Sequence, residues 1–349
     1  MRAVIRADAS ATIGHGHVMR CLALAGALRE RGFASIHFLL RRQPGDAVAA
    51  IEQAGCDWHA LPDDAADAQR DAEASAALLR TLGGTDLLVL DHYQRGADWV
   101  TTVRPQARCV LVIDDLADRP LAGDLLLDQN WHDDAFARYR PVWPAGGKTL
   151  FGPAYALLRP EFAAARAARG PRDGPLKRVV IAFGGSDPDN ATEACLATLH
   201  GAHPALHYDV IIGSGAPQGP AVRERWAKMP QVEVTIGAHD IARRFALADL
   251  FVGAGGSMTW ERASLGLPGI TLPIAANQQP LCAKLAAAGE GIDLGAFDAS
   301  KMPPLCAALS VLAARPEAVR DMATKIARRC DGAGASRVAA AVHARLDAV

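Results

Sequence analysis

The sequence has no excess of either charge, and it contains few aromatic residues. Its 37 lysine and arginine residues are balanced by 38 aspartate and glutamate residues, and aromatic residues make up 5% of the chain. A strongly basic surface of the kind that binds nucleic acid is therefore absent, and we expect no nucleic-acid partner. An anionic ligand would have to be bound by a few well-placed donors.

Long hydrophobic runs and paired cysteines are also missing. No stretch reaches the ~20 apolar residues of a membrane span, and the N-terminal segment MRAVIRADAS lacks the pattern of a signal peptide. The seven cysteines are widely spread, odd in number and without a CxxC pair, which is typical of reduced thiols. The sequence therefore predicts a cytoplasmic protein with no membrane partner.

The chain does have the length and the apolar content for two domains. Half of its 349 residues are hydrophobic, and a typical domain takes about 150 residues. In both halves, short apolar segments alternate with amphipathic ones, the pattern of parallel sheets covered by helices on both faces. Strands are expected at 3–7, 36–40, 87–90, 110–113, 125–127, 179–181, 210–212, 232–236, 250–252 and 270–272, and helices at 18–31, 47–54, 67–82 and 338–346.

The alternation pauses at residues 160–177, which are rich in Pro, Gly and charged residues and are interpreted as a linker. The sequence thus predicts an α/β protein with an N-terminal Rossmann-like domain at 1–160 and a C-terminal one at 178–335. A terminal helix is expected at 336–349. Because ligands of such sheets bind beyond the carboxyl ends of the strands, we expect a ligand cleft between the two domains.

A glycine-rich turn follows the first expected strand, in DASATIGHGHVMR. Gly14 and Gly16 allow the backbone to turn tightly and to present its amides to an anion at the start of the next helix. Met19 occupies the third glycine position of a dinucleotide fingerprint, which argues against a nicotinamide or flavin enzyme. His17 lies on the first turn of the helix, where a neutral imidazole suits a general base. A structural or phosphate-contacting histidine is the alternative.

Two further glycine loops follow expected strands in the second half, in IAFGGSDPDN and VGAGGSMTWERASLG. Two loops at one sheet edge fit a diphosphate better than a single phosphate. The residues concerned are Gly184, Gly185, Ser186, Gly255, Gly256, Ser257 and Met258. Glu261, one turn into the following helix, is placed to accept both hydroxyls of a ribose, although an acid there also favours the helix dipole. No GxxxxGK[ST] motif occurs, so a P-loop kinase is not expected.

Acidic residues and histidines gather at 91–93, 114–115 and 132–134. None of these clusters has a tight ligand spacing such as HExxH, so no metal ligands are assigned. Polar residues that line a sugar site at the strand ends explain the clusters as well.

A series of motifs then identifies a resemblance: DASATIGHGHVMRCLALA, LDHY, IDDLADRP, DLLLDQN, FGPAYALLRPEF, FGGSDP, GAGGSMTWERASLGLPGI and AANQ. In this order they resemble the UDP-2,4-diacetamido-2,4,6-trideoxy-β-L-altropyranose hydrolases of pseudaminic acid biosynthesis, from Arg6 to about Gln278. More distantly, the second half is similar to the UDP-GlcNAc-binding half of the bacterial glycosyltransferase that makes lipid II. The resemblance implies the GT-B architecture, with two Rossmann-like domains facing across a nucleotide-sugar cleft.

The resemblance also implies an activity: hydrolysis of a UDP-sugar to the free sugar and UDP, with neither a metal ion nor a cofactor. In the matching motifs His17 is the general base, and Tyr93 lies near the sugar. Glu261 binds the ribose, and Ser257 and its glycines bind the diphosphate. The sugar-side pair is Asn277 and Gln278.

The chemistry of the substrate class agrees with this interpretation. A glycosyl diphosphate already carries a good leaving group, so one base that activates water predicts an inverting single displacement. A glycosyltransferase would use the same fold and donor site but transfer the sugar to an alcohol. A non-catalytic nucleotide-sugar sensor would not need His17.

Overall fold

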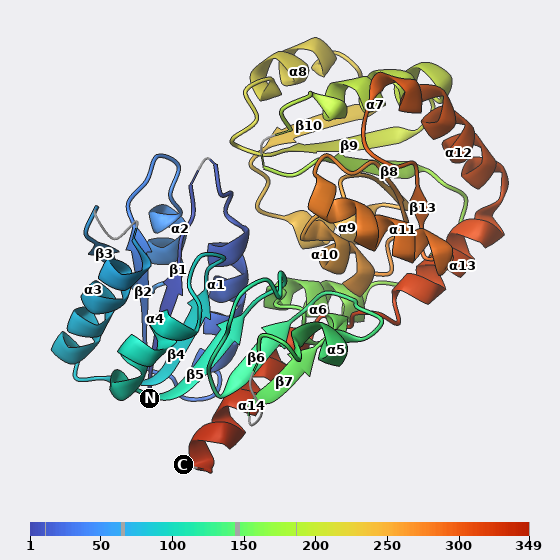
Figure 1. Cartoon of the computed structure of the whole chain (residues 1–349). Coiled ribbons are helices and arrows are strands. Elements are labelled where there is room, and N and C mark those ends of the chain that lie inside the picture. The colour runs from blue at the N-terminus through green and yellow to red at the C-terminus, as the bar shows by residue number, and fades with distance from the viewer. Residues whose placement is uncertain (11, 64–66, 144–146, 186, 349) are drawn as a thin grey trace. The chain divides into compact units, whose positions relative to one another are not determined.

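The computed structural model describes residues 1–10, 12–63, 67–143, 147–185 and 187–348. It divides the chain into two compact units, coloured along the sequence in Figure 1. Unit 1 comprises Met1–Pro160 together with Ala333–Val349, and unit 2 comprises Glu161–Gly332. The last segment of the chain therefore belongs to the first unit.

Unit 1 is built on a parallel sheet with the strand order β3-β2-β1-β4-β5-β6-β7. The strands are β1 (Arg2–Ala7), β2 (Ser35–Arg41), β3 (Asp57–Leu61), β4 (Thr85–Asp91), β5 (Ala107–Ile113), β6 (Leu125–Asp128) and β7 (Lys148–Phe151). The helices are α1 (Gly16–Arg29), α2 (Val48–Gln53), α3 (Ala68–Thr81), α4 (Ala97–Val103), α5 (Ala135–Tyr139) and α14 (Gly334–Asp347), with short 3-10 turns η1 (Arg104–Gln106) and η2 (Pro153–Tyr155).

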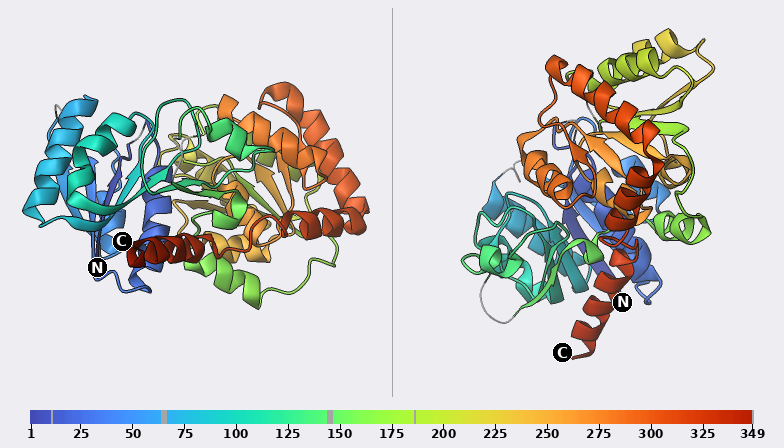
Figure 2. Two further views of the ribbon diagram at one scale, coloured as in Figure 1. Left: turned by 60° about the horizontal axis from the view of Figure 1, so that its bottom comes forward. Right: turned by 90° about the vertical axis from the view of Figure 1, so that its right-hand side faces the viewer.

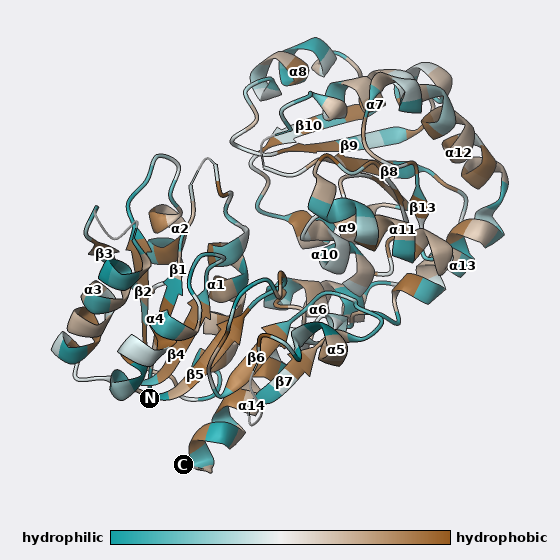
Figure 3. Ribbon diagram, in the orientation of Figure 1, coloured by the Kyte–Doolittle hydropathy of each residue, from teal (hydrophilic) through white to brown (hydrophobic). Residues whose placement is uncertain are grey.

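Alternating residues along the strands of unit 1 supply two cores. In β1, Ile5 packs in one core with α1, α2 and α14. Val4 packs in the other core with α3 and α4. Because the side chains on both faces are buried, the central strands are apolar along most of their length, and several of them are brown in Figure 3. Both views of Figure 2 show α14 as a straight terminal helix, and its Val338 and Val342 complete the first core.

Unit 2 has a second parallel sheet with the order β10-β9-β8-β11-β12-β13. Its strands are β8 (Arg178–Ala182), β9 (His207–Ile212), β10 (Val232–Ile236), β11 (Leu250–Gly253), β12 (Gly269–Thr271) and β13 (Ile292–Asp293). Its helices are α6 (Pro160–Ala168), α7 (Ala191–Ala202), α8 (Gly219–Trp226), α9 (Ile241–Leu247), α10 (Met258–Ser264), α11 (Gln279–Ala287), α12 (Met302–Ala314) and α13 (Pro316–Ile326), with η3 (Ala276–Gln278) and η4 (Ala299–Lys301). A core beneath α7, α8, α12 and α13 covers one face of the sheet.

The segment interpreted as a linker is ordered on unit 2. Residues 160–168 form α6, and three arginines at intervals of three donate to backbone carbonyls at the ends of other helices. Arg166 donates to Ser264, Ala327 and Cys330, Arg169 to Leu265, and Arg172 to Phe245 and Gly266. Guanidinium groups suit these positions because helix C-termini carry unsatisfied carbonyls and partial negative charge. The arginines thus hold the segment on the second unit.

Candidate active site

The carboxyl edge of the unit 1 sheet carries a row of buried aspartates. Asp8 directly follows β1, Asp91 ends β4, and Asp128 ends β6. Each accepts a hydrogen bond from one histidine, and the pairs are His92–Asp8 at 3.2 Å, His17–Asp91 at 2.7 Å and His132–Asp128 at 2.8 Å. The histidines of the clusters at 91–93 and 132–134 therefore each belong to an aspartate–histidine pair on one sheet edge.

The predicted base, His17, lies at the start of α1 and is held by the end of β4. Its Nδ1 is 2.7 Å from Oδ1 of Asp91, which is fully buried. A carboxylate only accepts hydrogen bonds, so the proton of a neutral His17 ring resides on Nδ1. No residue in the described part of the chain hydrogen-bonds to Nε2. Nε2 therefore presents a lone pair that can accept a proton.

Arg20 and Cys21 complete the surroundings of Asp91. Arg20 lies one turn after His17 and binds both carboxylate oxygens, with Nε–Oδ2 at 2.6 Å and Nη2–Oδ1 at 2.5 Å. The thiol of Cys21 donates to Oδ2 over 3.4 Å. Burial alone would raise the pKa of Asp91, but Arg20 and His17 outweigh it and hold that pKa well below its usual range. Asp91 therefore stays ionised and keeps Nδ1 of His17 as the donor.

Tyr93, which the resemblance assigns to the sugar site, lies beside this pair. Its ring meets the His17 ring edge to face, with centroids 4.6 Å apart and an interplanar angle of 80°. Burial, and next the carboxylate of Asp115, raise the pKa of the Tyr93 phenol above its usual value. The hydroxyl therefore remains protonated and able to donate a hydrogen bond.

The glycine turn before α1 is shaped by local hydrogen bonds. The backbone N–H of Gly14 donates to the carbonyl of Ser10 over 2.8 Å, and Gly14 has a positive φ of 80°. The Ser10 hydroxyl accepts from the amides of Thr12 and Ile13. Gly16 is the first residue of α1, so His17 is the second residue of the helix and directly follows the turn. The turn thus lies directly before α1, and His17 lies in the first turn of that helix.

In unit 2 the two glycine loops follow neighbouring strands. β8 and β11 pair with Ala182 opposite Gly253, so Gly184-Gly185 and Gly255-Gly256 leave the sheet side by side. A Cβ at Gly253 would overlap the carbonyl oxygen of Ala182, so this close approach requires glycine. Ser186 lies outside the described residues.

The remaining predicted residues of unit 2 gather around the second loop. Ser257 directly precedes α10, which begins at Met258, and Glu261 lies one turn later on the same helix. Gln278 packs against Gly255 and Gly256, and its side-chain oxygen accepts from the amide of Ile274 over 3.1 Å. Asn277, the preceding residue of η3, is exposed.

The sequence analysis did not assign a role to Asp91, Arg20 or Thr259. Asp91 and Arg20 belong to motifs that were noted, but nothing in the spacing links them to His17. The Thr259 hydroxyl, at the start of α10, is buried and has no hydrogen-bond partner among the residues that the structure describes. A buried hydroxyl without a partner is costly, so it marks the second loop as a place for a polar ligand group.

The described residues contain no group of three His, Cys, Asp or Glu side chains placed to hold a metal ion. No helix in the same part of the chain has both the length and the hydropathy to cross a bilayer.

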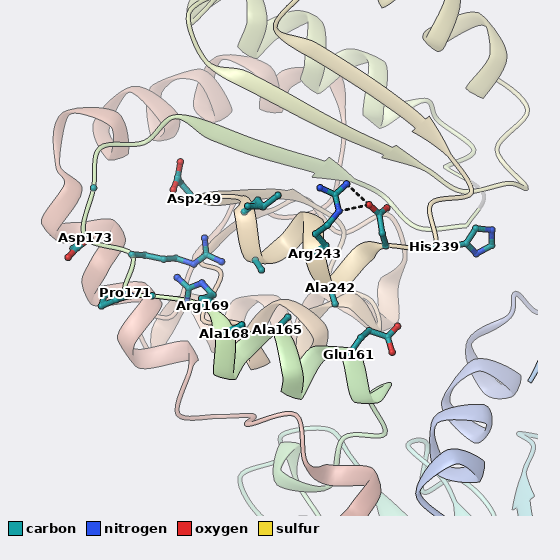
Figure 4. A pocket seen from close by; sticks show the side chains of 16 residues that line it. Glu161, Ala165, Ala168, Arg169, Pro171, Asp173, His239, Ala242, Arg243 and Asp249 are labelled. Atoms are coloured by element: carbon teal, nitrogen blue, oxygen red, sulfur yellow. Dashed lines mark hydrogen bonds and ion pairs between the residues drawn. The ribbon is translucent and has the colours of Figure 1, made fainter.

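A cavity of about 760 Å³ lies elsewhere in unit 2, between α6 and α9. Alanines of both helices face each other across it, and Arg243 is bonded to Asp240 at its rim (Figure 4). Arg172 also lines the cavity, and burial, and next the charge of Arg169, lower its pKa to about 9. None of the predicted site residues lines this cavity.

Comparison with known proteins gives two distant relatives in sequence. The chain is 26% identical over 306 residues to the spore coat polysaccharide biosynthesis protein SpsG of Bacillus subtilis, a match that covers 84% of each protein. It is 24% identical over 291 residues to the uncharacterized protein MJ1062 of Methanocaldococcus jannaschii, covering 78% of this chain and 55% of that protein. No family model matches the chain.

Solved structures match the chain over its whole length. The glycosyltransferase SnogD from Streptomyces nogalater superposes with a TM-score of 0.65 at 16% identity, covering 99% of both chains. MurG of Acinetobacter baumannii gives 0.64 at 15% identity over 98% of this chain and 99% of that one. Anabaena Alr3699/HepE, solved in complex with UDP and glucose, gives 0.60 at 13% identity over 99% of both. The predicted fold class, two Rossmann-like α/β units of GT-B type, is confirmed.

Proposed function

We propose that this protein acts on a nucleotide-activated sugar and hydrolyses the glycosidic C–O bond of a UDP-linked 2,4-diacetamido-2,4,6-trideoxy sugar. The Asp91–His17 pair is the observation that carries this proposal, because it offers an open basic nitrogen at the carboxyl edge of a GT-B-type sheet. The motif resemblance supports the substrate, and the relationship to SpsG supports a role in polysaccharide biosynthesis. Pseudaminic acid biosynthesis is the proposed pathway.

His17 would act as the general base of a single displacement. Water attacks the anomeric carbon while Nε2 takes one of its protons, and the bond from that carbon to the diphosphate oxygen breaks. The electron pair of this bond leaves with UDP, and the sugar is released with inverted configuration. Asp91 stabilises the imidazolium that forms, as the carboxylate does in other aspartate–histidine pairs. Tyr93 is proposed to contact the sugar.

Unit 2 would bind the UDP moiety. The amides of Gly185, Gly255 and Gly256 are proposed to bind the diphosphate, together with Ser257 and the start of α10. Glu261 is proposed to accept both ribose hydroxyls. Gly14 and Gly16 in unit 1 are proposed to contact the substrate, as are Met258, Asn277 and Gln278 in unit 2 and Ser186, which lies outside the described residues.

A UDP-sugar-dependent glycosyltransferase is the second candidate, because glycosyltransferases are prominent among the matching structures. The two activities differ only in what attacks the anomeric carbon. A hydrolase uses water and needs no acceptor, whereas a transferase releases UDP at a useful rate only when an alcohol is supplied.

The test is to incubate the purified protein with the diacetamido UDP-sugar alone and to follow UDP release by chromatography. We expect steady release of UDP. Exhaustive EDTA treatment should leave this release unchanged, and His17→Asn should abolish it. His203→Ala is the matched control and should retain activity, because the side chain of this half-buried histidine of unit 2 hydrogen-bonds only to Ser310 among the described residues. UDP release only upon addition of an acceptor would establish the transferase. Loss with EDTA and recovery with a divalent ion would overturn the metal-independent mechanism.

A further inference from the structure

The aspartate–histidine pairs His92–Asp8, His17–Asp91 and His132–Asp128, at the carboxyl edge of the unit 1 sheet, differ at the second nitrogen of each ring. In His92, Nε2 donates to Asp8 and Nδ1 accepts from the amide of Gln94 over 3.0 Å, so both nitrogens are satisfied. In His132, Nε2 lies 2.8 Å from Asp128, and nothing in the described chain hydrogen-bonds to Nδ1. His132 therefore resembles His17, whose second nitrogen is also open. Both differ from the His92–Asp8 pair, which we call closed because both ring nitrogens of His92 have a partner.

The surroundings of Asp128 determine which nitrogen of His132 is open as an acceptor. Asp128 is fully buried, and it also accepts from the Tyr139 hydroxyl over 2.9 Å and from the amide of Asn130 over 2.8 Å. In both contacts the oxygens of Asp128 act as hydrogen-bond acceptors. The proton of a neutral His132 ring then resides on Nε2, and Nδ1 can accept a hydrogen bond from an O–H or N–H group.

Aromatic rings extend from this pair to the surface. Phe151 lies next to Asp128 in the β6–β7 ladder, and the ring of Tyr139 stacks on it with centroids 5.1 Å apart. Phe136 meets Phe151 edge to face at 5.2 Å, and 68% of Phe136 is exposed. One exposed apolar residue is ordinary in a soluble fold. A pyranose offers an apolar C–H face together with hydroxyl or amide donors. An exposed aromatic ring and an open acceptor nitrogen in one cluster could bind both parts of such a sugar.

We propose that His132 and Phe136 form a second sugar-binding subsite at the end of β6, in which Nδ1 of His132 accepts a donor of the sugar and Phe136 packs on its C–H face. The subsite rests on the proposed function, since it would serve the same UDP-sugar. β5 separates β4 from β6, so the two pairs are about 10 Å apart along the sheet edge. The subsite would therefore receive a substituent of the sugar that is remote from the anomeric carbon at His17. In the proposed substrate, an acetamido group is such a substituent, and it is polar.

The experiment compares His132→Phe, which removes the acceptor and keeps a ring, with His132→Gln, which retains an acceptor oxygen. We expect His132→Phe to raise KM for the UDP-sugar about five- to tenfold, the effect of losing one hydrogen bond, with kcat within threefold. His132→Gln should recover most of the loss, and Phe136→Ala should raise KM similarly. The affinity for UDP alone should be unchanged in all three, and His203→Ala is the control. An unchanged KM in folded His132→Phe would overturn the proposal.

A binding measurement separates failure of the subsite from failure of the proposed function. N-acetylglucosamine is titrated into the wild-type protein while the histidine ring signals are followed by NMR, with His132 assigned through its variants. The His132 ring signals should shift and those of His92 should not. If no UDP-sugar is hydrolysed but this shift occurs, the subsite stands and the reaction is wrong. If hydrolysis occurs and neither KM nor the His132 signals respond, the subsite is wrong.

Discussion

Asp91→Asn isolates the contribution of the carboxylate that holds His17. The change keeps the shape of the side chain but replaces one acceptor oxygen with an NH₂ group. Both oxygens of Asp91 bind Arg20, and Oδ1 also binds His17. If the remaining oxygen stays on Nε of Arg20, the new NH₂ group faces Nδ1 of His17 and donates to it. Nδ1 must then give up its proton, which moves to Nε2 and removes the lone pair that the reaction needs.

The expected loss of kcat follows from this exchange of donor and acceptor between the two ring nitrogens of His17. The corresponding change in the serine proteases lowers kcat about 10⁴-fold through the wrong tautomer, and a general base usually contributes about 10²–10⁴-fold. We therefore expect kcat of Asp91→Asn to fall about 10²–10⁴-fold. Affinity for UDP, which unit 2 is proposed to bind, should be unchanged. Stability should fall by about 1.5–3 kcal/mol, because Arg20 loses a charged acceptor.

The assay is UDP release under saturating substrate, with urea unfolding measured on the same preparations. Asp8→Asn is the matched control, because Asp8 is as deeply buried at the same sheet edge but belongs to the closed pair with His92. It should lose stability while retaining kcat within about threefold. The double variant Asp91→Asn with His17→Asn should be no slower than His17→Asn alone, since residues that act as one unit are not additive. Folded Asp91→Asn with near-normal kcat, or additive losses in the double variant, would refute the reasoning.

Three further predictions concern the base, the nucleotide and acid stability. His17→Asn should lower kcat about 10²–10⁴-fold with little change in UDP affinity. When the wild-type protein reacts in H₂¹⁸O, mass spectrometry should find the label in the sugar, and label in UDP would mean that water attacks phosphorus. Glu261→Ala should weaken UDP binding by about 1.5–3 kcal/mol in calorimetry, and unchanged affinity would remove Glu261 from the site. Burial raises the pKa of Asp8, Asp71 and Asp91, but their hydrogen-bonded partners outweigh it and lower all three below the 3.8 of a free aspartate. The unfolded chain therefore takes up more protons than the folded one below about pH 4, so the melting temperature should fall as the pH drops below that value. A melting temperature that does not change between pH 4 and pH 2 would contradict this.

The sequence predicted the elements whose signals are local. The central strands are apolar on both faces, and the glycine turns mark where strands end and helices begin, so His17 and Glu261 could be placed at their helices. β3 and β7 were not predicted because both are short edge strands with partly exposed, polar residues. Edge strands need to satisfy only one neighbour and bury less, which weakens their alternation.

Contacts between distant segments could not be read from the pattern. Asp91 is 74 residues from His17, and only the strand order, with β4 beside β1, brings them together. The same holds for residues 160–177, where proline, glycine and charge favoured a linker. The arginines of that segment bind carbonyls about 70 to 160 residues away, and a sequence does not show which carbonyls a helix end leaves open.

The place of α14 in unit 1 has a consequence for the order of folding during synthesis. Unit 2 is one continuous stretch, Glu161–Gly332, so all of its residues are available before α14 has been made. Unit 1 begins first but lacks Val338, Val342 and Leu346 of its core until residues 334–347 emerge from the ribosome. Domains generally fold as units as soon as their chain is complete. Of the two units, the one that begins first is therefore completed last, and the aspartate–histidine edge that it carries becomes fully supported only after α14 has been made.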